Sequence, residues 1–194
     1  AMLDAALAAL VEGAALWKTV LPDFTPGSRI GIKVNTLNDQ CPTSVAVVKA
    51  LIAALQTGLG ADPGDIIVWD RRLDELTLCG FTESALGVRV LGTQNSKTDL
   101  GGPGYGDPVC GKISGKWPRL SRILTDLTDF TVNCPVLKTH GVSGVTGALK
   151  NIYGIIHNPG DYHTSLLTAL PALYRLPPIR NRIRLTVIDA LIAV

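Results

Sequence analysis

The chain has 194 residues, of which 46% are apolar and 18% charged, a balance that is typical of an ordinary globular domain and excludes disordered and collagen-like chains. Eighteen Lys and Arg residues against sixteen Asp and Glu residues give a formal net charge of +2 without a basic run, which argues against a nucleic-acid partner. The apolar stretches are shorter than the roughly 20 residues that a membrane-spanning helix needs, so we expect no membrane insertion.

The first half of the chain predicts helices that alternate with strands. Apolar residues recur at helical spacing over 2–19 and again over 43–59, where Thr43 stands at the N-cap position. Residues 73–78 can add one or two helical turns. Short apolar runs predict strands, and these fall at 30–35, 66–69 and 88–91.

The second half begins with a segment rich in glycine and proline, 93–118, which only a long loop or a small hairpin tolerates. Helices are then predicted at 120–127 and 142–156, and strands at 130–136 and 184–188. Nearly continuous apolar strands alternating with helices indicate an α/β fold. We expect three layers, with a mainly parallel open sheet of about five strands and helices on both faces.

The ends of the sequence favour a single domain cut from a longer chain. Ala1 precedes Met2, the only methionine, a pattern typical of a residue added during cloning. The other end stops within an apolar run at Val194. We therefore expect residues 1–194 to form one α/β domain that is truncated at both ends relative to the natural protein.

The four cysteines are spaced too widely for a zinc site, a ferredoxin site or a dense disulfide framework. They are Cys41, Cys79, Cys110 and Cys134. A domain of this length builds a sufficient core without covalent links, so we expect thiols and no internal disulfide.

Polar side chains stand where the predicted strands end. Such residues are Lys33 and Asn35, Asp70 and Arg71, Lys138, Thr139 and His140, and Asp189. In an open parallel sheet these ends share one edge, and ligands bind in the crevice outside it. We therefore expect Lys33, Asp70, Lys138, His140 and Lys150 to line one pocket, although a single charged residue at a strand end is more often solvated.

The predicted helix 142–156 has two different faces. One carries the apolar stripe Val142, Val145, Leu149, Ile152 and Ile156, which we expect to be buried. The other carries Lys150 among small residues, including glycines that need a compensation such as close approach of a backbone or a ligand. With Lys138 and the helix N-terminus, this face suits an anion. Alternatively, the glycines serve tight helix packing and Lys150 extends to water.

The three histidines do not form a recognisable metal pattern. His140 and His157 would lie at opposite ends of the predicted helix, roughly 25 Å apart, so one metal cannot take both. A single histidine with Asp70 or Asp189 stays open, and the metal, if any, is unknown. No glycine-lysine-serine/threonine sequence with the spacing of a phosphate-binding P-loop is present.

Several motifs together resemble domain of unknown function family 362. They are 31–35 (GIKVN), 67–71 (IVWDR), 133–140 (NCPVLKTH), 146–154 (TGALKNIYG), 157–159 (HNP), 162–163 (YH) and 184–191 (RLTVIDAL). The resemblance covers nearly the whole chain. It implies no settled activity, because the family has none.

The resemblance carries two further implications. Some relatives have an added ferredoxin-like domain with iron–sulphur cysteines, which this chain lacks. Relatives of the Asn-Pro…Tyr-His type often begin with a twin-arginine export signal, which implies an extracytoplasmic, exported protein and raises the expectation of a bound cofactor whose identity is unknown. A glycine-rich segment tends to follow the 184–191 motif in relatives, so part of the site can lie beyond Val194.

The stretch from His140 to Lys150, with glycines at 141, 144 and 147, also resembles the His, Gly-rich, Lys stretch of nickel-pincer lactate racemases. In those enzymes such residues meet an anionic cofactor and substrate. The likeness rests on five positions, three of them glycine, and we transfer no mechanism from it.

Two classes of function remain open. The first is an enzyme acting on a small anionic molecule, with His140 as proton carrier and Asp70 or Asp189 orienting it. The cofactor or anion would then be held by Lys33, Asn35, Lys138, Lys150 and Asn151. The second is a non-catalytic, iron–sulphur-associated redox or ligand-binding module that serves a partner protein. A bound anion beside Lys150 favours the first class, and a metal with Cys134 as ligand favours the second.

Overall fold

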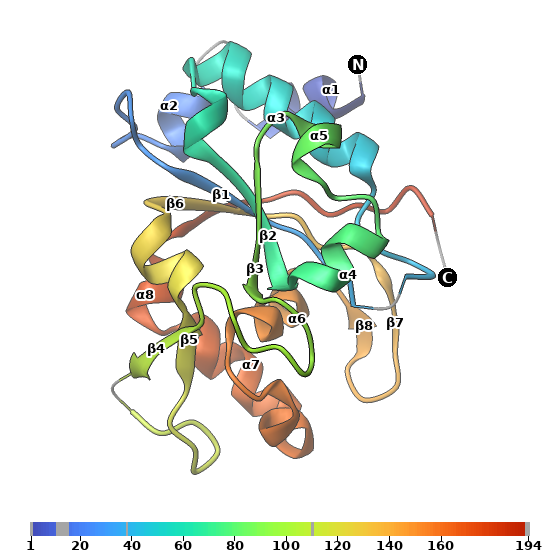
Figure 1. Cartoon of the computed structure of the whole chain (residues 1–194), viewed down its shortest axis with the longest axis vertical. Coiled ribbons are helices and arrows are strands. Elements are labelled where there is room, and N and C mark those ends of the chain that lie inside the picture. The colour runs from blue at the N-terminus through green and yellow to red at the C-terminus, as the bar shows by residue number, and fades with distance from the viewer. Residues whose placement is uncertain (1, 11–15, 38, 110, 193–194) are drawn as a thin grey trace.

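A five-stranded, all-parallel sheet lies at the centre of the domain (Figure 1). The computed structural model describes residues 2–10, 16–37, 39–109 and 111–192. The strand order is β3-β2-β1-β6-β9. The strands span β1 Ile30–Lys33, β2 Ile66–Arg72, β3 Arg89–Gln94, β6 Phe130–Asn133 and β9 Ile183–Thr186.

Successive side chains of the strands pack into two separate hydrophobic cores. In β2, Ile66 and Val68 pack into one core, whereas Ile67 and Trp69 pack into the other, because successive residues of a strand face opposite sides. The first core lies under α1 (Met2–Leu10), α2 (Leu16–Val20), α3 (Val45–Leu59) and α5 (Glu83–Leu86). The second lies under α7 (Leu166–Tyr174), α8 (Pro177–Arg180) and the π-helical turn η2 (Ile123–Leu127). The predicted three-layer α/β fold is confirmed.

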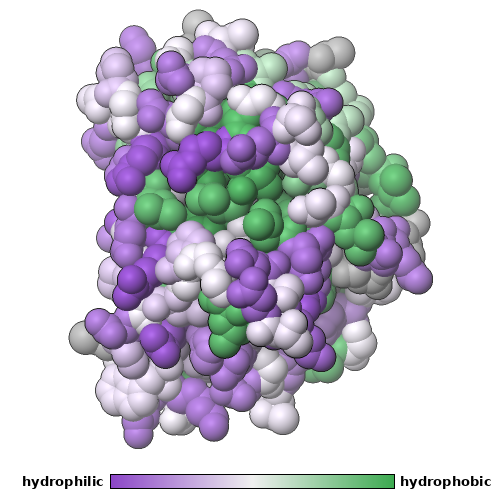
Figure 2. Space-filling model, in the orientation of Figure 1, coloured by the Kyte–Doolittle hydropathy of each residue, from purple (hydrophilic) through white to green (hydrophobic). Residues whose placement is uncertain are grey.

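Hydrophobic residues are not spread evenly over the surface. In the orientation of Figure 1, hydrophobic residues gather in a band across the middle of the visible face, with hydrophilic surface above and below it (Figure 2). None of the helices in the described part of the chain has the length and apolar character that crossing a bilayer requires.

The second helix begins later than predicted. Ser44, not Thr43, is the N-cap of α3, since its side chain accepts a hydrogen bond from the backbone N–H of Ala46. The Thr43 hydroxyl instead donates to the carbonyl of Cys134 at 2.8 Å and so ties this turn to β6. The predicted first helix is present as α1 and α2, and residues 11–15 between them lie outside the described residues.

The predicted helix 142–156 is wrong over its first half. The antiparallel hairpin of β7 (Lys138–His140) and β8 (Gly144–Thr146) comes first, followed by α6 (Ala148–Asn151) and the 3₁₀ helix η3 (Ile152–Ile155). Gly144 adopts φ +73°, which turns the hairpin and which an α-helix excludes. Val142 and Val145 are therefore 58% and 52% exposed instead of buried. Leu149 in α6 was also expected to be buried and is 40% exposed, whereas Ile152 and Ile156 are buried as expected.

The remaining elements differ from the predictions mainly at their boundaries. Residues 120–127 are not one helix, because β5 (Arg119–Ser121) pairs with β4 (Tyr105–Pro108) and η2 follows. The glycine-rich segment 93–118 therefore contains β4, the first strand of this small hairpin. The helical turns after β2 are present as α4 (Leu73–Leu78), and the segment before α7 is the 3₁₀ helix η4 (Pro159–Ser165). A further 3₁₀ turn, η1 (Pro63–Asp65), leads into β2.

The sheet has a topological switch point between β1 and β6, where the direction in which strands are added reverses. From β1 the chain adds β2 and β3 on one side, and then crosses over to add β6 and β9 on the other. Lys33 at the end of β1 lies opposite Asn133 at the end of β6. Ligands bind at such a switch point in open α/β sheets, outside the carboxyl ends of the strands.

Candidate functional site

A cavity of about 300 Å³ opens at this edge of the sheet. Its walls come from the ends of β1 and β2, from the β7–β8 hairpin, and from α6, η3 and η4. Seven of the eight predicted site residues line it: Lys33, Asn35, Asp70, Lys138, His140, Lys150 and Asn151. The topology therefore brings together residues from four separate segments of the chain.

A buried ion pair forms the floor of the cavity. The ammonium of Lys33 lies 2.7 Å from Oδ1 of Asp70, and the two side chains are only 1% and 6% exposed. The ammonium also donates to the carbonyl of Val34 at 2.7 Å and to Oδ1 of Asn151 at 3.2 Å. Its three N–H groups thus have three acceptors, so Lys33 holds the floor in place and has no donor left for a ligand.

The carboxylate of Asp70 is equally occupied. Besides Lys33, Oδ1 accepts from the backbone N–H of Arg71 at 2.7 Å. Oδ2 accepts from both the backbone N–H and the hydroxyl of Thr36, at 2.8 and 2.9 Å. Four acceptor positions with four donors favour a structural role for Asp70 over the predicted orientation of His140.

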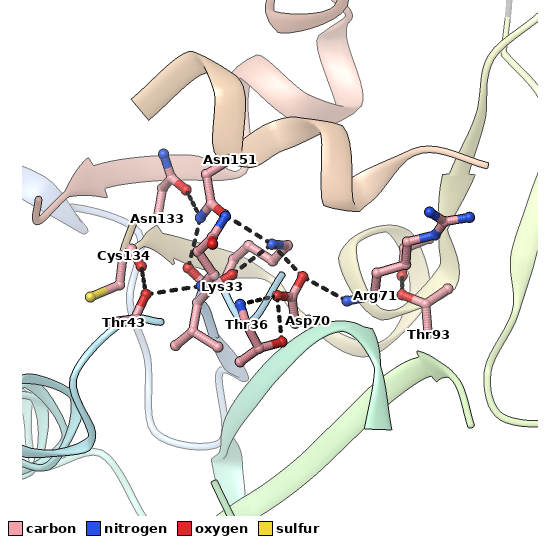
Figure 3. Close-up of polar contacts among 12 residues, drawn as sticks. Lys33, Thr36, Thr43, Asp70, Arg71, Thr93, Asn133, Cys134 and Asn151 are labelled. Atoms are coloured by element: carbon pink, nitrogen blue, oxygen red, sulfur yellow. Dashed lines mark hydrogen bonds and ion pairs between the residues drawn. The ribbon is translucent and has the colours of Figure 1, made fainter. Parts of the chain in front are cut away.

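Asn151 joins the ends of β1 and β6 beneath the cavity (Figure 3). Its amide nitrogen donates to the carbonyl of Lys33 and to Oδ1 of Asn133, at 3.2 and 2.8 Å. Its amide oxygen accepts from Lys33 and from Asn35, both at 3.2 Å. All donors and acceptors of this buried amide are used, which fixes the spacing of the two strand ends.

Lys138 is a second lysine with all its donors used. Its ammonium donates to Oδ1 of Asn35 at 3.0 Å and to the carbonyls of Leu37 and Cys41 at 2.7 and 3.2 Å. These acceptors are neutral, so the positive charge has no carboxylate in contact with it among the described residues. Burial lowers the pKa of Lys138, while Cys41 and Asp70 act in the opposite direction.

Lys150 differs from both of these lysines. Its ammonium lies over the ring of Tyr153, 4.5 Å from the ring centroid, and it has no hydrogen-bond acceptor or carboxylate partner among the described residues. Burial lowers the pKa of Lys150, and the charge of Lys138 lowers it further. The three N–H groups of Lys150 are thus available to a molecule in the cavity.

His140 is held by the tip of its own hairpin. Its Nδ1 accepts from the backbone N–H groups of Val142 and Ser143, both at 3.2 Å. The ring stacks on His163, with centroids 6.2 Å apart and an interplanar angle of 28°. Burial lowers the pKa of His140, and the neighbouring charge of Lys150 adds to this. The lowered pKa favours the neutral form of the imidazole.

The cavity also contains cations and rings that the sequence analysis did not assign to the site. Arg71 lines it, and Figure 3 shows its guanidinium on the side away from Lys33. Arg72 forms an ion pair with Glu75. His163 and Tyr153 complete the wall. Arg71 was visible in the sequence as a strand-end residue and His163 as part of a family motif, and only the stacking of His163 on His140 was unpredictable.

Asp189, which the sequence analysis placed in the site, does not line this cavity. Its carboxylate accepts from the backbone N–H of Ser44 at 2.7 Å and from that of Leu191 at 3.1 Å. Asp189 is buried, and its carboxylate supplies a hydrogen-bond acceptor for the backbone N–H of the N-cap residue of α3. It follows the end of the edge strand β9, and β6 separates it from the crevice, which explains why a strand-end position did not bring it into the site.

The three cysteines that the structure describes do not line the cavity. Cys41, Cys79 and Cys134 are free thiols, and Cys110 lies outside the described residues. Burial raises the pKa of Cys134 to about 12, and nearby Asp189 raises it further, so this thiol is neutral. No group of three His, Cys, Asp or Glu side chains in residues 2–10, 16–37, 39–109 and 111–192 could hold a metal ion.

One protein-family profile covers the part of the chain that forms the sheet and the cavity. The profile of the family described as Domain of unknown function (DUF362) matches residues 30–194, which include every strand of the sheet and every residue that lines the cavity. The chain belongs to the DUF362 family. No curated protein matches it.

A solved structure shares the fold. The lactate racemase apoprotein from Thermoanaerobacterium thermosaccharolyticum superposes with a TM-score of 0.57 at 12% sequence identity. The match covers 95% of this DUF362 chain and 47% of that protein, so the chain spans about half the length of the racemase. At this identity the similarity establishes the common α/β fold alone.

Proposed function

We propose that the cavity binds a small anionic molecule, carrying a carboxylate or a phosphate, and that the DUF362 chain is part of an enzyme that acts on it. The observation that carries this proposal is the ammonium of Lys150, which faces the cavity without an acceptor in the described structure. A partly buried ammonium is stabilised by a charge-assisted hydrogen bond, and an anion in the cavity supplies one.

The charge balance of the lining supports an anion. Five Lys and Arg side chains face two carboxylates, Asp70 and Glu75, and both carboxylates are already paired within the wall. Arg71, Lys138 and Lys150 remain without a carboxylate partner in the described residues. A cleft with an excess of one charge concentrates ligands of the opposite charge.

The neutral imidazole of His140 supports chemistry in addition to binding. Histidine is the side chain most often used for proton transfer near neutral pH. The structural neighbour is named for lactate, a small carboxylate, which agrees with the proposed class of ligand. No observation on the described residues favours the alternative of a non-catalytic redox module, which stays a prediction from the family resemblance.

Replacing Lys150 with methionine is the direct test. We expect the affinity for inorganic phosphate and for pyruvate, measured by calorimetry at low salt, to fall about tenfold or more, because a charge-assisted hydrogen bond is lost. Stability should change by no more than about 1 kcal/mol, since most of the apolar stem is kept. Lys49→Met, which removes the same charge from an exposed position on α3, should leave the affinity unchanged. Equal anion affinity in Lys150→Met and the unmodified protein would refute the proposal.

We also propose that the natural protein is exported by the twin-arginine route, on the basis of the Asn158-Pro159 and Tyr162-His163 motifs. Fractionation of cells that express the complete natural gene should place the protein outside the cytoplasm. Inactivating the twin-arginine translocase should shift it to the cytoplasm. Cytoplasmic protein in both strains would contradict export.

A further inference from the structure

Two neighbouring histidines of the cavity carry their protons on different nitrogens. Nδ1 of His140 accepts two backbone N–H groups, from Val142 and Ser143, at 3.2 Å each. A nitrogen that accepts hydrogen bonds carries its lone pair in the ring plane and no proton. The proton of neutral His140 therefore resides on Nε2, and Nε2–H is a donor.

The second histidine, His163, has the opposite arrangement. Its Nδ1 lies 3.1 Å from the carbonyl oxygen of Pro159 in the same 3₁₀ helix, η4. A carbonyl oxygen only accepts, so Nδ1 of His163 must donate its proton. In the neutral ring the lone pair is then on Nε2, which can act as a base.

The two rings and the free ammonium are arranged around Tyr153. Lys150 lies over its ring at 4.5 Å, and the ring of His163 meets it edge-on with centroids 5.5 Å apart. The His140 ring stacks on that of His163, with centroids 6.2 Å apart. All four residues line the same cavity, so an anion-binding cation, a hydrogen-bond donor and a base lie within reach of one small molecule.

We propose that His163 and His140 act as a base and a hydrogen-bond donor in a proton shift on a small anion that carries a carbonyl group. The proposal rests on the proposed function, because Lys150 holds the anionic end. Nε2 of His163 takes a proton from the carbon next to the carbonyl, and the C–H electron pair moves to give an enolate. His163 then returns the proton to the same carbon, from which the enolate electron pair re-forms the C–H bond, so the reaction needs no further reactant.

A neutral His140 suits the developing charge on the carbonyl oxygen. A donor that is neutral, and whose other nitrogen is fixed by backbone N–H groups, can polarise a carbonyl without giving up its proton, as in other isomerases that use a neutral imidazole. Burial, Lys150, His163 and Lys138 all lower the pKa of His140 and keep it neutral. The cavity volume of about 300 Å³ is at the lower end for ligand sites and suits a small substrate.

The tautomers can be measured on the protein as it is. Long-range ¹H–¹⁵N correlation spectra at pH 8 should show His140 with its proton on Nε2 and His163 with its proton on Nδ1, with the signals assigned from single His→Gln variants. His163 with its proton on Nε2, or both rings in the same form, would overturn the inference.

Hydrogen exchange on carbon tests the chemistry. Pyruvate and dihydroxyacetone phosphate, a carboxylate and a phosphate probe, are incubated with the protein in D₂O, and loss of their C–H signals is followed by ¹H NMR. We expect exchange above the buffer rate with at least one probe, and a fall of about 10²-fold or more in His163→Gln, the range typical of a lost general base. Added imidazole should restore exchange in His163→Ala. His157→Gln is the matched control, because His157 packs against Tyr105 outside the cavity, and it should exchange at the unmodified rate.

The outcomes separate this inference from the proposed function. If the unmodified protein binds phosphate through Lys150 but exchanges neither probe, anion binding stands and the proton shift is refuted. If exchange depends on His163 while Lys150→Met binds phosphate normally, the proton shift stands and the role of Lys150 is refuted. Exchange that persists at full rate in His163→Gln also refutes the base.

Discussion

Replacing Asp70 with asparagine should lower the free energy of unfolding by about 3–5 kcal/mol, because it leaves the buried ammonium of Lys33 without a counter-charge. The two side chains are 1% and 6% exposed, so solvent does not screen the loss. The same change weakens the bonds that Asp70 accepts from Thr36 and so loosens the segment after β1. Urea unfolding with an unchanged m-value measures the difference.

A matched control removes a carboxylate from the surface. Asp107 lies exposed on β4, and Asp107→Asn should change the stability by less than about 0.5 kcal/mol. The double variant Lys33→Met/Asp70→Asn should lose less than the sum of the two single variants, since removing both charges leaves neither one uncompensated. A loss of under 1 kcal/mol in Asp70→Asn would show that the pair does not hold the cavity floor.

Replacing Gly154 with alanine should destabilise the protein by about 1–3 kcal/mol through overpacking of the same ion pair. A Cβ at this position would lie 2.7 Å from the ammonium of Lys33 and 2.8 Å from Oδ1 of Asp70. The Lys33 side chain is buried and bound to three acceptors, so it cannot move aside without losing one of them. Thermal unfolding and urea titration of the variant measure the size of the effect.

Gly141→Ala is the control for Gly154→Ala. A Cβ at Gly141 meets no atom within 4 Å, so the substitution should be neutral to within about 0.5 kcal/mol. The effect of Gly154→Ala should also shrink in an Asp70→Asn background, because the pair it displaces is already weakened. Equal stability of Gly154→Ala and the unmodified protein would mean that the floor adapts to an added methyl group.

The amino-acid sequence by itself determined the fold class and seven of the residues that line the cavity. Apolar runs of strand length, separated by helices, indicate a parallel sheet, and that sheet necessarily collects residues such as Lys33, Asp70 and Lys138 at one edge. Gly154 was recognised as a glycine that needs a compensation, and the compensation is the close approach of the Lys33–Asp70 pair. These inferences succeed because they depend on local periodicity and on topology.

Only the tertiary structure decided which of these polar groups are occupied and which are free. Lys33, Lys138 and Lys150 are equivalent in the sequence, yet the first two have all their donors filled by backbone, amide or carboxylate oxygens and the third has none filled in the described residues. The hairpin at 138–146 was likewise invisible, since apolar residues at helical spacing do not reveal the left-handed turn at Gly144. Hydrogen-bond partners come from segments that are distant in the chain, and a local pattern contains no information about them.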